Sequence, residues 1–334
     1  MNARCATGTK SMIRIAYQAS HEQFPPSQLL KFVAMAEREG FDAIHSSDHF
    51  HPWSERQGHG GFSFAWLGAA MQQTSLPFSV VCAPGQRYHP AVVAQAAATL
   101  SEMFPGRFHL NLASGEAINE SITGEQWPPK DERNARLLEC VNVIRRLLVG
   151  ETLTHRGRVT VKHARLYTLP AAPPLLFGAA MSKDTAAWMG AWADGLVTVC
   201  QTPEKLKEIM DAFRHGGGES KPVHVKLDVS YAPDEREALM GAHDQWRTNV
   251  FSSLIMADIA QVAQFEELAK NITPETMRQH VIVSSEPQVY VERIGEIAAL
   301  GVDTIILHNV NRSHETFIET FGKFVLPRVR QLSS

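Results

Sequence analysis

The chain has 334 residues, of which 44% are hydrophobic and 20% charged, and it carries a formal net charge of -3. This balance is typical of a globular protein with a large core, and it excludes the basic face that a nucleic-acid-binding protein needs. The cysteines are far apart along the chain, so they indicate neither a disulfide framework nor a cysteine-type zinc site.

Residues 1–11 contain no apolar signal segment, and a second methionine, Met12, directly precedes the first expected strand. We expect a disordered extension over residues 1–11 and a single domain over residues 12–334. No apolar run approaches the ~18 residues that a membrane-spanning helix needs. We therefore expect a cytoplasmic protein that acts on a small-molecule substrate and binds neither nucleic acid nor membrane.

Short apolar runs alternate along the chain with longer helical patterns. We expect strands at residues 13–18, 41–46, 76–82, 107–113, 175–177, 195–199, 223–232 and 304–308. We expect helices at residues 25–40, 62–73, 90–105, 131–148, 182–192, 203–214, 288–300 and 315–330. Two insertions interrupt this order, a hairpin near residues 152–169 and an irregular, partly helical segment near residues 233–279.

Eight strand and helix pairs with mostly apolar strands predict a parallel sheet that is buried on both faces. Closed on itself, such a sheet is a (β/α)8 TIM barrel. An open doubly wound sheet would usually carry a G-x-G-x-x-G motif after its first strand, where this chain has Tyr17-Gln18-Ala19-Ser20. The sequence therefore favours the barrel.

The stretch at residues 41–53 is the most informative part of the chain, because an apolar strand delivers Asp48, His49 and Trp53 to one loop. A plain polar loop with a tryptophan that fills a gap is the simpler alternative. In TIM barrels, however, the catalytic groups lie at the carboxyl ends of the strands. A carboxylate, an imidazole and an indole at that end could carry out acid and base chemistry on a flat ligand, and redox chemistry would need a cofactor.

The same rule selects further residues at the ends of the expected strands. The candidate catalytic residues are Glu22, His49, Trp53 and Glu116. The candidate cofactor-binding residues are Asp48, Ser79, Val80, Cys82, Ser114, Gly115, Glu116, Asn119, Gly178, Ala179, Ala180, Met181, Ser182 and Cys200.

A metal-dependent hydrolase is the main alternative from another class, because His49-Phe50-His51 is an H-x-H motif of the kind that opens metal sites. The other ligands of such a site are missing, since the fifth and sixth strands end in Gly178 and Cys200. We therefore expect no metal. A degenerate barrel without catalytic activity stays open as a further alternative.

Four blocks of the chain resemble, in order and spacing, the F420-dependent glucose-6-phosphate dehydrogenase branch of the luciferase-like flavin and deazaflavin oxidoreductases. The blocks lie at residues 19–24, 47–53, 87–95 and 114–120. The resemblance implies that Asp48 contacts the cofactor, His49 is the base, Trp53 lies beside the substrate and Glu116 is the partner acid.

The resemblance also implies how the cofactor lies in the barrel. Its ring would rest against a bulge at Ser79-Val80, where the family often has a non-prolyl cis peptide. Its phosphate end would meet Ala180-Met181-Ser182, where helix-opening amides form an anion site. A plain helix cap by Ser182 is the alternative there.

Two departures from the family pattern change the expected ligands. The sugar-phosphate dehydrogenases hold the substrate phosphate with Lys and Arg, whereas this chain has Cys200-Gln201-Thr202, Ile255-Met256 and Gln279-His280 in those regions. Residues 178–181 also lack the run of glycines that lets the long tail of F420 approach the backbone. We therefore expect FMN rather than F420, and hydride transfer or monooxygenation of an unidentified small organic substrate. A homodimer or a separate flavin reductase is compatible with this expectation.

Overall fold

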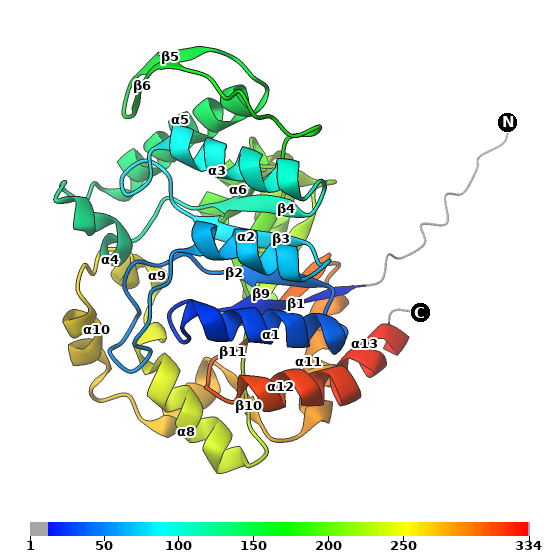
Figure 1. Cartoon of the computed structure of the whole chain (residues 1–334). Helices are drawn as coiled ribbons and strands as arrows, with labels where there is room; N and C mark the ends of the chain where they lie inside the picture. The colour runs from blue at the N-terminus through cyan, green and yellow to red at the C-terminus, as the bar shows by residue number, and fades with distance from the viewer. Residues whose placement is uncertain (1–12, 333–334) are drawn as a thin grey trace, which may run out of the picture.

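The computed structural model describes residues 13–332, so the disorder expected for residues 1–11 lies outside the described residues. A closed parallel barrel dominates this part of the chain (Figure 1), and each of its strands was expected from the sequence. The barrel strands are β1 (Arg14–Ala19), β2 (Ala43–Ser46), β3 (Phe78–Cys82), β4 (Phe108–Leu112), β7 (Leu176–Ala179), β8 (Leu196–Val199), β9 (Val223–Tyr231) and β11 (Thr304–Asn309). The pairing of β8 with β9 closes the barrel.

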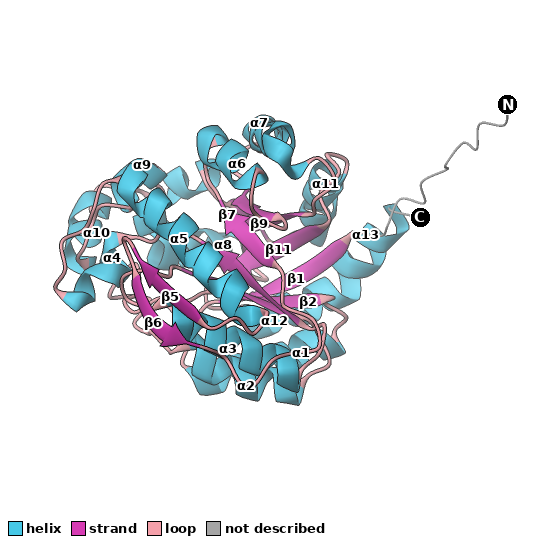
Figure 2. Ribbon diagram, turned by 90° about the horizontal axis from the view of Figure 1, so that it is seen from above, coloured by secondary structure: helices cyan, strands magenta, loops and turns pink. Residues whose placement is uncertain are grey.

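Helices surround the barrel on its outside (Figure 2). They are α1 (Pro26–Arg38), α2 (Ser63–Gln73), α3 (Pro90–Met103), α5 (Lys130–Leu148), α6 (Lys183–Gly190), α7 (Pro203–Phe213), α11 (Pro287–Ala298), α12 (His314–Thr320) and α13 (Leu326–Leu332). Four of them, α1, α3, α7 and α11, begin with a proline, which fits the first turn of a helix because that turn leaves its amide hydrogens unpaired. No helix in residues 13–332 is long and apolar enough to cross a membrane.

Both expected insertions are present. The first is an antiparallel hairpin of β5 (Leu153–Arg156) and β6 (Thr160–Ala164), which lies beside α5 at the edge of the molecule (Figure 1). The second contains α8 (Glu235–Trp246), α9 (Ser253–Met256) and α10 (Val262–Ala269). Two short elements were not expected, α4 (Ala117–Glu120) after β4 and β10 (Ile282–Ser284), which pairs with β9.

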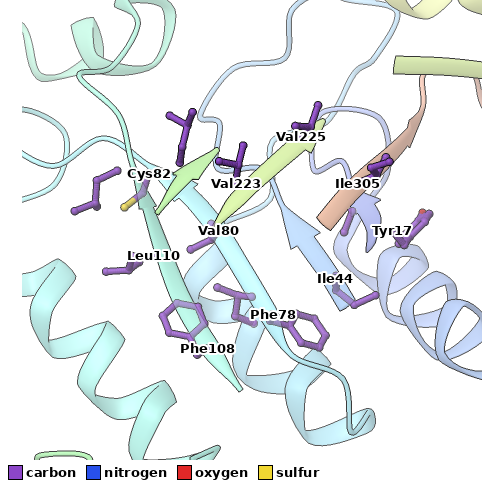
Figure 3. Close-up of a cluster of buried hydrophobic side chains, with 14 of the residues drawn as sticks. Tyr17, Ile44, Phe78, Val80, Cys82, Phe108, Leu110, Val223, Val225 and Ile305 are labelled. Atoms are coloured by element: carbon purple, nitrogen blue, oxygen red, sulfur yellow. The ribbon is translucent and has the colours of Figure 1, made fainter. Parts of the chain in front are cut away.

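Two sets of side chains leave the barrel strands in opposite directions, because successive residues of a strand alternate between its faces. The outward set packs under the helices as the main core, and Figure 3 shows part of it around Phe78, Val80 and Leu110. The inward set includes a small apolar layer of Ala16, Val197 and Ile306. Polar side chains lie inside the barrel on either side of this layer.

The expectation of a cis peptide at Ser79-Val80 is wrong, because residues 13–332 contain no cis peptide bond. Both residues lie in the middle of β3, where Ser79 is in register with His45 and His109 on the neighbouring strands. Regular trans geometry completes this pairing without a bulge.

The contact between α6 and α7 shows how closely the outer helices pack. A Cβ atom added at Gly190, its last residue, would overlap the carbonyl oxygen of Phe213 at the end of α7. We expect Gly190→Ala to lower the free energy of unfolding by ~1–3 kcal/mol, the usual cost of overpacking. Urea denaturation measures the change.

Gly68 in α2 is the matched control, because nothing lies within 4 Å of the position that its Cβ would take. Gly68→Ala should raise the free energy of unfolding by ~0.4–1 kcal/mol, since it restricts the unfolded chain at no steric cost. Equal stability of the two variants would contradict this account of the packing between α6 and α7.

Candidate active site

His49 stands between two carboxylates at the carboxyl end of the barrel. It follows β2, Glu22 follows β1, and Glu116 follows β4. The Nε2 atom of His49 lies 3.7 Å from Oε1 of Glu22 and 3.9 Å from Oε2 of Glu116. The structure thus brings these three candidate catalytic residues together, although they are up to 94 residues apart in the chain, and the fourth, Trp53, lies beside them.

Asn119 fixes which ring nitrogen of His49 carries the proton. The Oδ1 atom of Asn119 accepts hydrogen bonds from the backbone N–H groups of Phe50 (2.9 Å) and His51 (3.4 Å), so its Nδ2 group faces His49. This group donates to Nδ1 of His49 at 3.1 Å. Because an amide nitrogen can only donate, Nδ1 is an acceptor, and the neutral imidazole carries its proton on Nε2. The Nε2–H group therefore points toward the two carboxylates.

Glu22 is held in its ionised form. Burial alone raises its pKa, but His49 and the hydroxyl groups of Ser20 and Ser47 outweigh burial and hold the pKa below its usual range. Both hydroxyls donate to Oε2 of Glu22, at 2.7 Å and 2.8 Å. Since the side chain is only 4% exposed, Glu22 serves as a fixed negative charge behind His49.

Glu116 has the opposite character. Burial is the main cause that raises its pKa, and the carboxylates of Glu22 and Glu120 raise it further against the opposing effect of His49. The side chain is nevertheless 34% exposed, so its carboxyl group is accessible to solvent. The two carboxyl groups flank one imidazole, and their pKa values are shifted in opposite directions. This arrangement is typical of an acid and base pair.

Trp53 lies next to the imidazole. Its ring centroid is 4.8 Å from that of His49, and its other side packs edge-on against Phe265 at 5.3 Å. Only 7% of Trp53 is exposed, so the second insertion fixes the orientation of the indole. The expected position beside a substrate therefore depends on α10, which carries Phe265.

Asp48 belongs to a buried ionic network behind the site. Its Oδ1 atom accepts from Ser63 (2.8 Å) and Tyr88 (3.0 Å), and its Oδ2 atom accepts from Arg87 (2.9 Å). Arg87 also pairs with Glu120 at 3.4 Å. Three hydrogen bonds thus hold the carboxylate of Asp48, so its side chain positions the loop that carries His49. Arg87 and Glu120 received no role from the sequence, although both lie in blocks that resemble the family.

A second charged cluster lies inside the barrel and was missed at the sequence level. Nζ of Lys226 is 2.7 Å from Oδ1 of Asp228, which also lies 3.2 Å from Nδ1 of His308. Burial opposes the ionisation of Asp228, but Lys226 and His308 bring its pKa down to about 2. Lys226 also lies over the ring of Trp246 at 4.8 Å. The available signal was the alternation Val-Lys-Leu-Asp-Val in β9, which places Lys226 and Asp228 on the same face of the strand.

The candidate cofactor-binding residues divide by the direction of their side chains. Ser79 and Ala179 face the interior of the barrel, whereas Val80, Cys82 and Ala180 are part of the outer core. Any contact between these last three residues and a cofactor would therefore run through their backbone.

The remaining candidates line the rim. Gly115 has a φ of 88° and lies in the same loop as Ser114, and Gly178 packs against Met189 in α6. Met181 is exposed, Ser182 caps α6 by accepting from the N–H group of Thr185, and burial raises the pKa of the half-buried Cys200 to about 11.

The two histidines of the H-x-H motif do not converge. Nδ1 of His51 lies 2.8 Å from the carbonyl oxygen of Ile118, while His49 faces Asn119 and the carboxylates. In the part of the chain that the structure describes, no three His, Cys, Asp or Glu side chains are grouped to hold a metal ion. The geometry therefore gives no support to a metal-dependent hydrolase.

The barrel and its rim of acid and base groups agree with comparisons to known proteins. The model of the luciferase-like monooxygenase family matches residues 6–304. The F420-dependent glucose-6-phosphate dehydrogenase of Beutenbergia cavernae is 34% identical over 330 residues, which cover 96% of this chain and 98% of the relative. The chain therefore belongs to the luciferase-like oxidoreductase family, and it is an enzyme of that family.

Solved structures extend the comparison. An F420-dependent secondary alcohol dehydrogenase in complex with an F420-acetone adduct superposes with a TM-score of 0.87 at 27% identity, and the match covers 95% of this chain and 99% of that one. A riboflavin lyase with modified FMN superposes with a TM-score of 0.76 at 15% identity, over 96% and 92% of the two chains, which shows the fold alone.

The contact between Asn119 and His49 can be tested without knowledge of the reaction. We expect nitrogen NMR of the histidine rings to show the Nε2–H tautomer for neutral His49. Asn119→Asp places an acceptor beside Nδ1 and should move the proton to that atom. Asn134→Asp on α5 is the control and should leave the His49 signals unchanged. An Nδ1–H tautomer in the unmodified protein would contradict the orientation of the Asn119 amide.

Proposed function

We propose that the protein is an F420-dependent dehydrogenase that oxidises an alcohol without a phosphate group. The observation that carries the proposal is the imidazole of His49, held between an ionised Glu22 and a Glu116 whose pKa is raised. The relatives in the family that name F420 support the choice of cofactor, and both of them name a dehydrogenase.

The structure weakens the steric reason for expecting FMN. The side chain of Ala180 packs in the outer core, so it does not narrow the rim, and the space beside Gly178 is filled by Met189. Only Ala179 and Met181 remain as obstacles to a long tail. The first amides of α6, after Ser182, could hold the anionic groups of that tail. The residues at this rim therefore fit F420 as well as FMN.

The acid and base groups supply the proton chemistry that alcohol oxidation requires. Bound F420 would supply a ring that accepts the hydride from the substrate carbon. The Nε2–H group of His49 can donate a hydrogen bond to the substrate oxygen. Glu116 is the accessible carboxylate and can accept the hydroxyl proton, while the buried charge of Glu22 keeps the imidazole oriented. This assignment reverses the roles that the family resemblance implied for His49 and Glu116.

The charges inside the barrel favour a substrate without phosphate. Lys226 is already paired with Asp228, so it offers no unpaired positive charge to a phosphate. Arg87 is likewise paired with Asp48 and Glu120. An anionic phosphate at this end would also face the carboxylate of Glu22, which disfavours its binding. A neutral hydroxyl compound avoids that repulsion.

Parallel titrations test the cofactor. We expect F420 to bind more tightly than FMN, with binding followed by the fluorescence of each ring, because the rim accommodates the longer tail. Reduction of F420 by a set of secondary alcohols, read at its visible absorption band, tests the reaction. Tight binding of FMN without detectable binding of F420 would reject the proposed cofactor and restore the expectation of a flavin enzyme.

The dependence of the rate on pH tests the role of Glu116. Because the pKa of Glu116 is raised, the basic form that accepts a proton is lost as the pH falls through a value above the usual range of a carboxyl group. We expect kcat/KM for alcohol oxidation to fall on that acidic side. Glu116→Gln should lower the rate by ~100- to 10,000-fold and remove this pH dependence. The exposed Glu125→Gln should change neither, and an unaltered acidic limb in Glu116→Gln would exclude Glu116 as the base.

A further inference from the structure

We infer that the opposite end of the barrel holds a second binding site, for a small aromatic carboxylate. A cavity of about 390 Å³ lies where the barrel strands begin. Arg14, Phe78, Phe108 and Thr304 line it, and each is the first residue of its strand. The active site lies at the carboxyl ends of the strands, so the barrel interior separates the two sites. The volume is in the range of ~300–1,000 Å³ that is common for small-molecule pockets.

Four residues that line this cavity each carry a buried polar side-chain atom that lacks a hydrogen-bond partner among residues 13–332. These atoms are Oγ of Ser101, Nε2 of His109, Nε2 of His224 and Oγ1 of Thr304. Ser101, His224 and Thr304 are 5%, 6% and 3% exposed, so more than nine-tenths of each is buried. Buried polar atoms normally have partners, and their concentration around one cavity points to a polar ligand group.

The charged side chain at the cavity favours an anionic ligand. Arg14 is exposed at the rim, and its guanidinium group forms no ion pair with a described residue. Burial and Arg14 together lower the pKa of His109 to about 4, and burial, His109 and Arg14 lower the pKa of His224. Both imidazoles are therefore neutral near pH 7, and each can donate one hydrogen bond. No Asp or Glu is among the described residues that line the cavity.

The apolar walls of the cavity favour a ligand with an aromatic ring. The ring of Phe177 lines the cavity together with a proline-rich segment at residues 171–175, whereas the rings of Phe78 and Phe108 pack in the outer core beside it. The ring of Phe177 lies 4.7 Å from His109 and 4.8 Å from His224, so the two neutral donors are set beside an aromatic face. A planar carboxylate matches the two parallel N–H groups of an arginine, and an attached aromatic ring matches the apolar walls. An inorganic anion would leave those walls uncovered.

Benzoate is the probe for this site, and isothermal titration calorimetry on the full chain measures its affinity. We expect saturable binding of one benzoate, with benzamide about tenfold weaker or worse because it lacks the charge that Arg14 attracts. Arg14→Met should weaken benzoate by about tenfold or more, whereas Arg236→Met, which alters an exposed arginine in α8, should leave the affinity unchanged. Thr304→Val tests the hydroxyl and should weaken the binding of benzoate, because the variant lacks this hydrogen-bond donor.

Saturation with F420 or FMN separates this inference from the proposed function. Benzoate should bind with the same affinity when the active site is occupied, whichever cofactor the enzyme uses. Competition by the cofactor, equal affinity of Arg14→Met, or no binding of benzoate up to about 10 mM would each overturn the inference. A thermal melt of each variant verifies that the loss of binding is not a loss of folding.

Discussion

Closure of the parallel sheet is the constraint on which the rest of the structure depends. When β8 pairs with β9 and β11 pairs with β1, all the strands end at one rim and begin at the other. Because the side chains alternate between the two faces of each strand, an inward-facing residue can reach solvent only at one of the two ends of the barrel. This geometry explains why polar residues that are distant in sequence, such as Glu22 and Glu116, can share one imidazole.

Much of this arrangement could be predicted from the sequence. The barrel strands are short apolar runs that carry a strong pattern, and the loop at residues 41–53 stood out because His49 and Trp53 interrupt such a run. The helices at residues 235–269 were expected only as a partly helical segment, since no strand separates one of them from the next. The order of elements therefore follows from local patterns, and the details of the insertions depend on tertiary packing.

The direction of single side chains was harder to predict. The lack of a glycine run disfavours F420 only if Ala179 and Ala180 both face the rim, but the Cβ atom of Ala180 lies in the outer core. The paired roles of Arg87 and Glu120 require two loops to meet, which the sequence does not reveal. The Lys226 and Asp228 pair, by contrast, could have been found from the period of two in β9.

The hydrogen bonds of Asn119 connect separate segments around the active site. Its Oδ1 atom accepts from the N–H groups of both Phe50 and His51, and Asn119 itself is part of α4, whose first amide, that of Ala117, donates to the carbonyl oxygen of Ala257. Hydrogen bonds thus link the loop after β2, the turn after β4 and the insertion after β9 around the imidazole. A substitution near Ala257 in the insertion can therefore shift the imidazole of His49 through Asn119, although it touches neither the imidazole nor the two carboxylates.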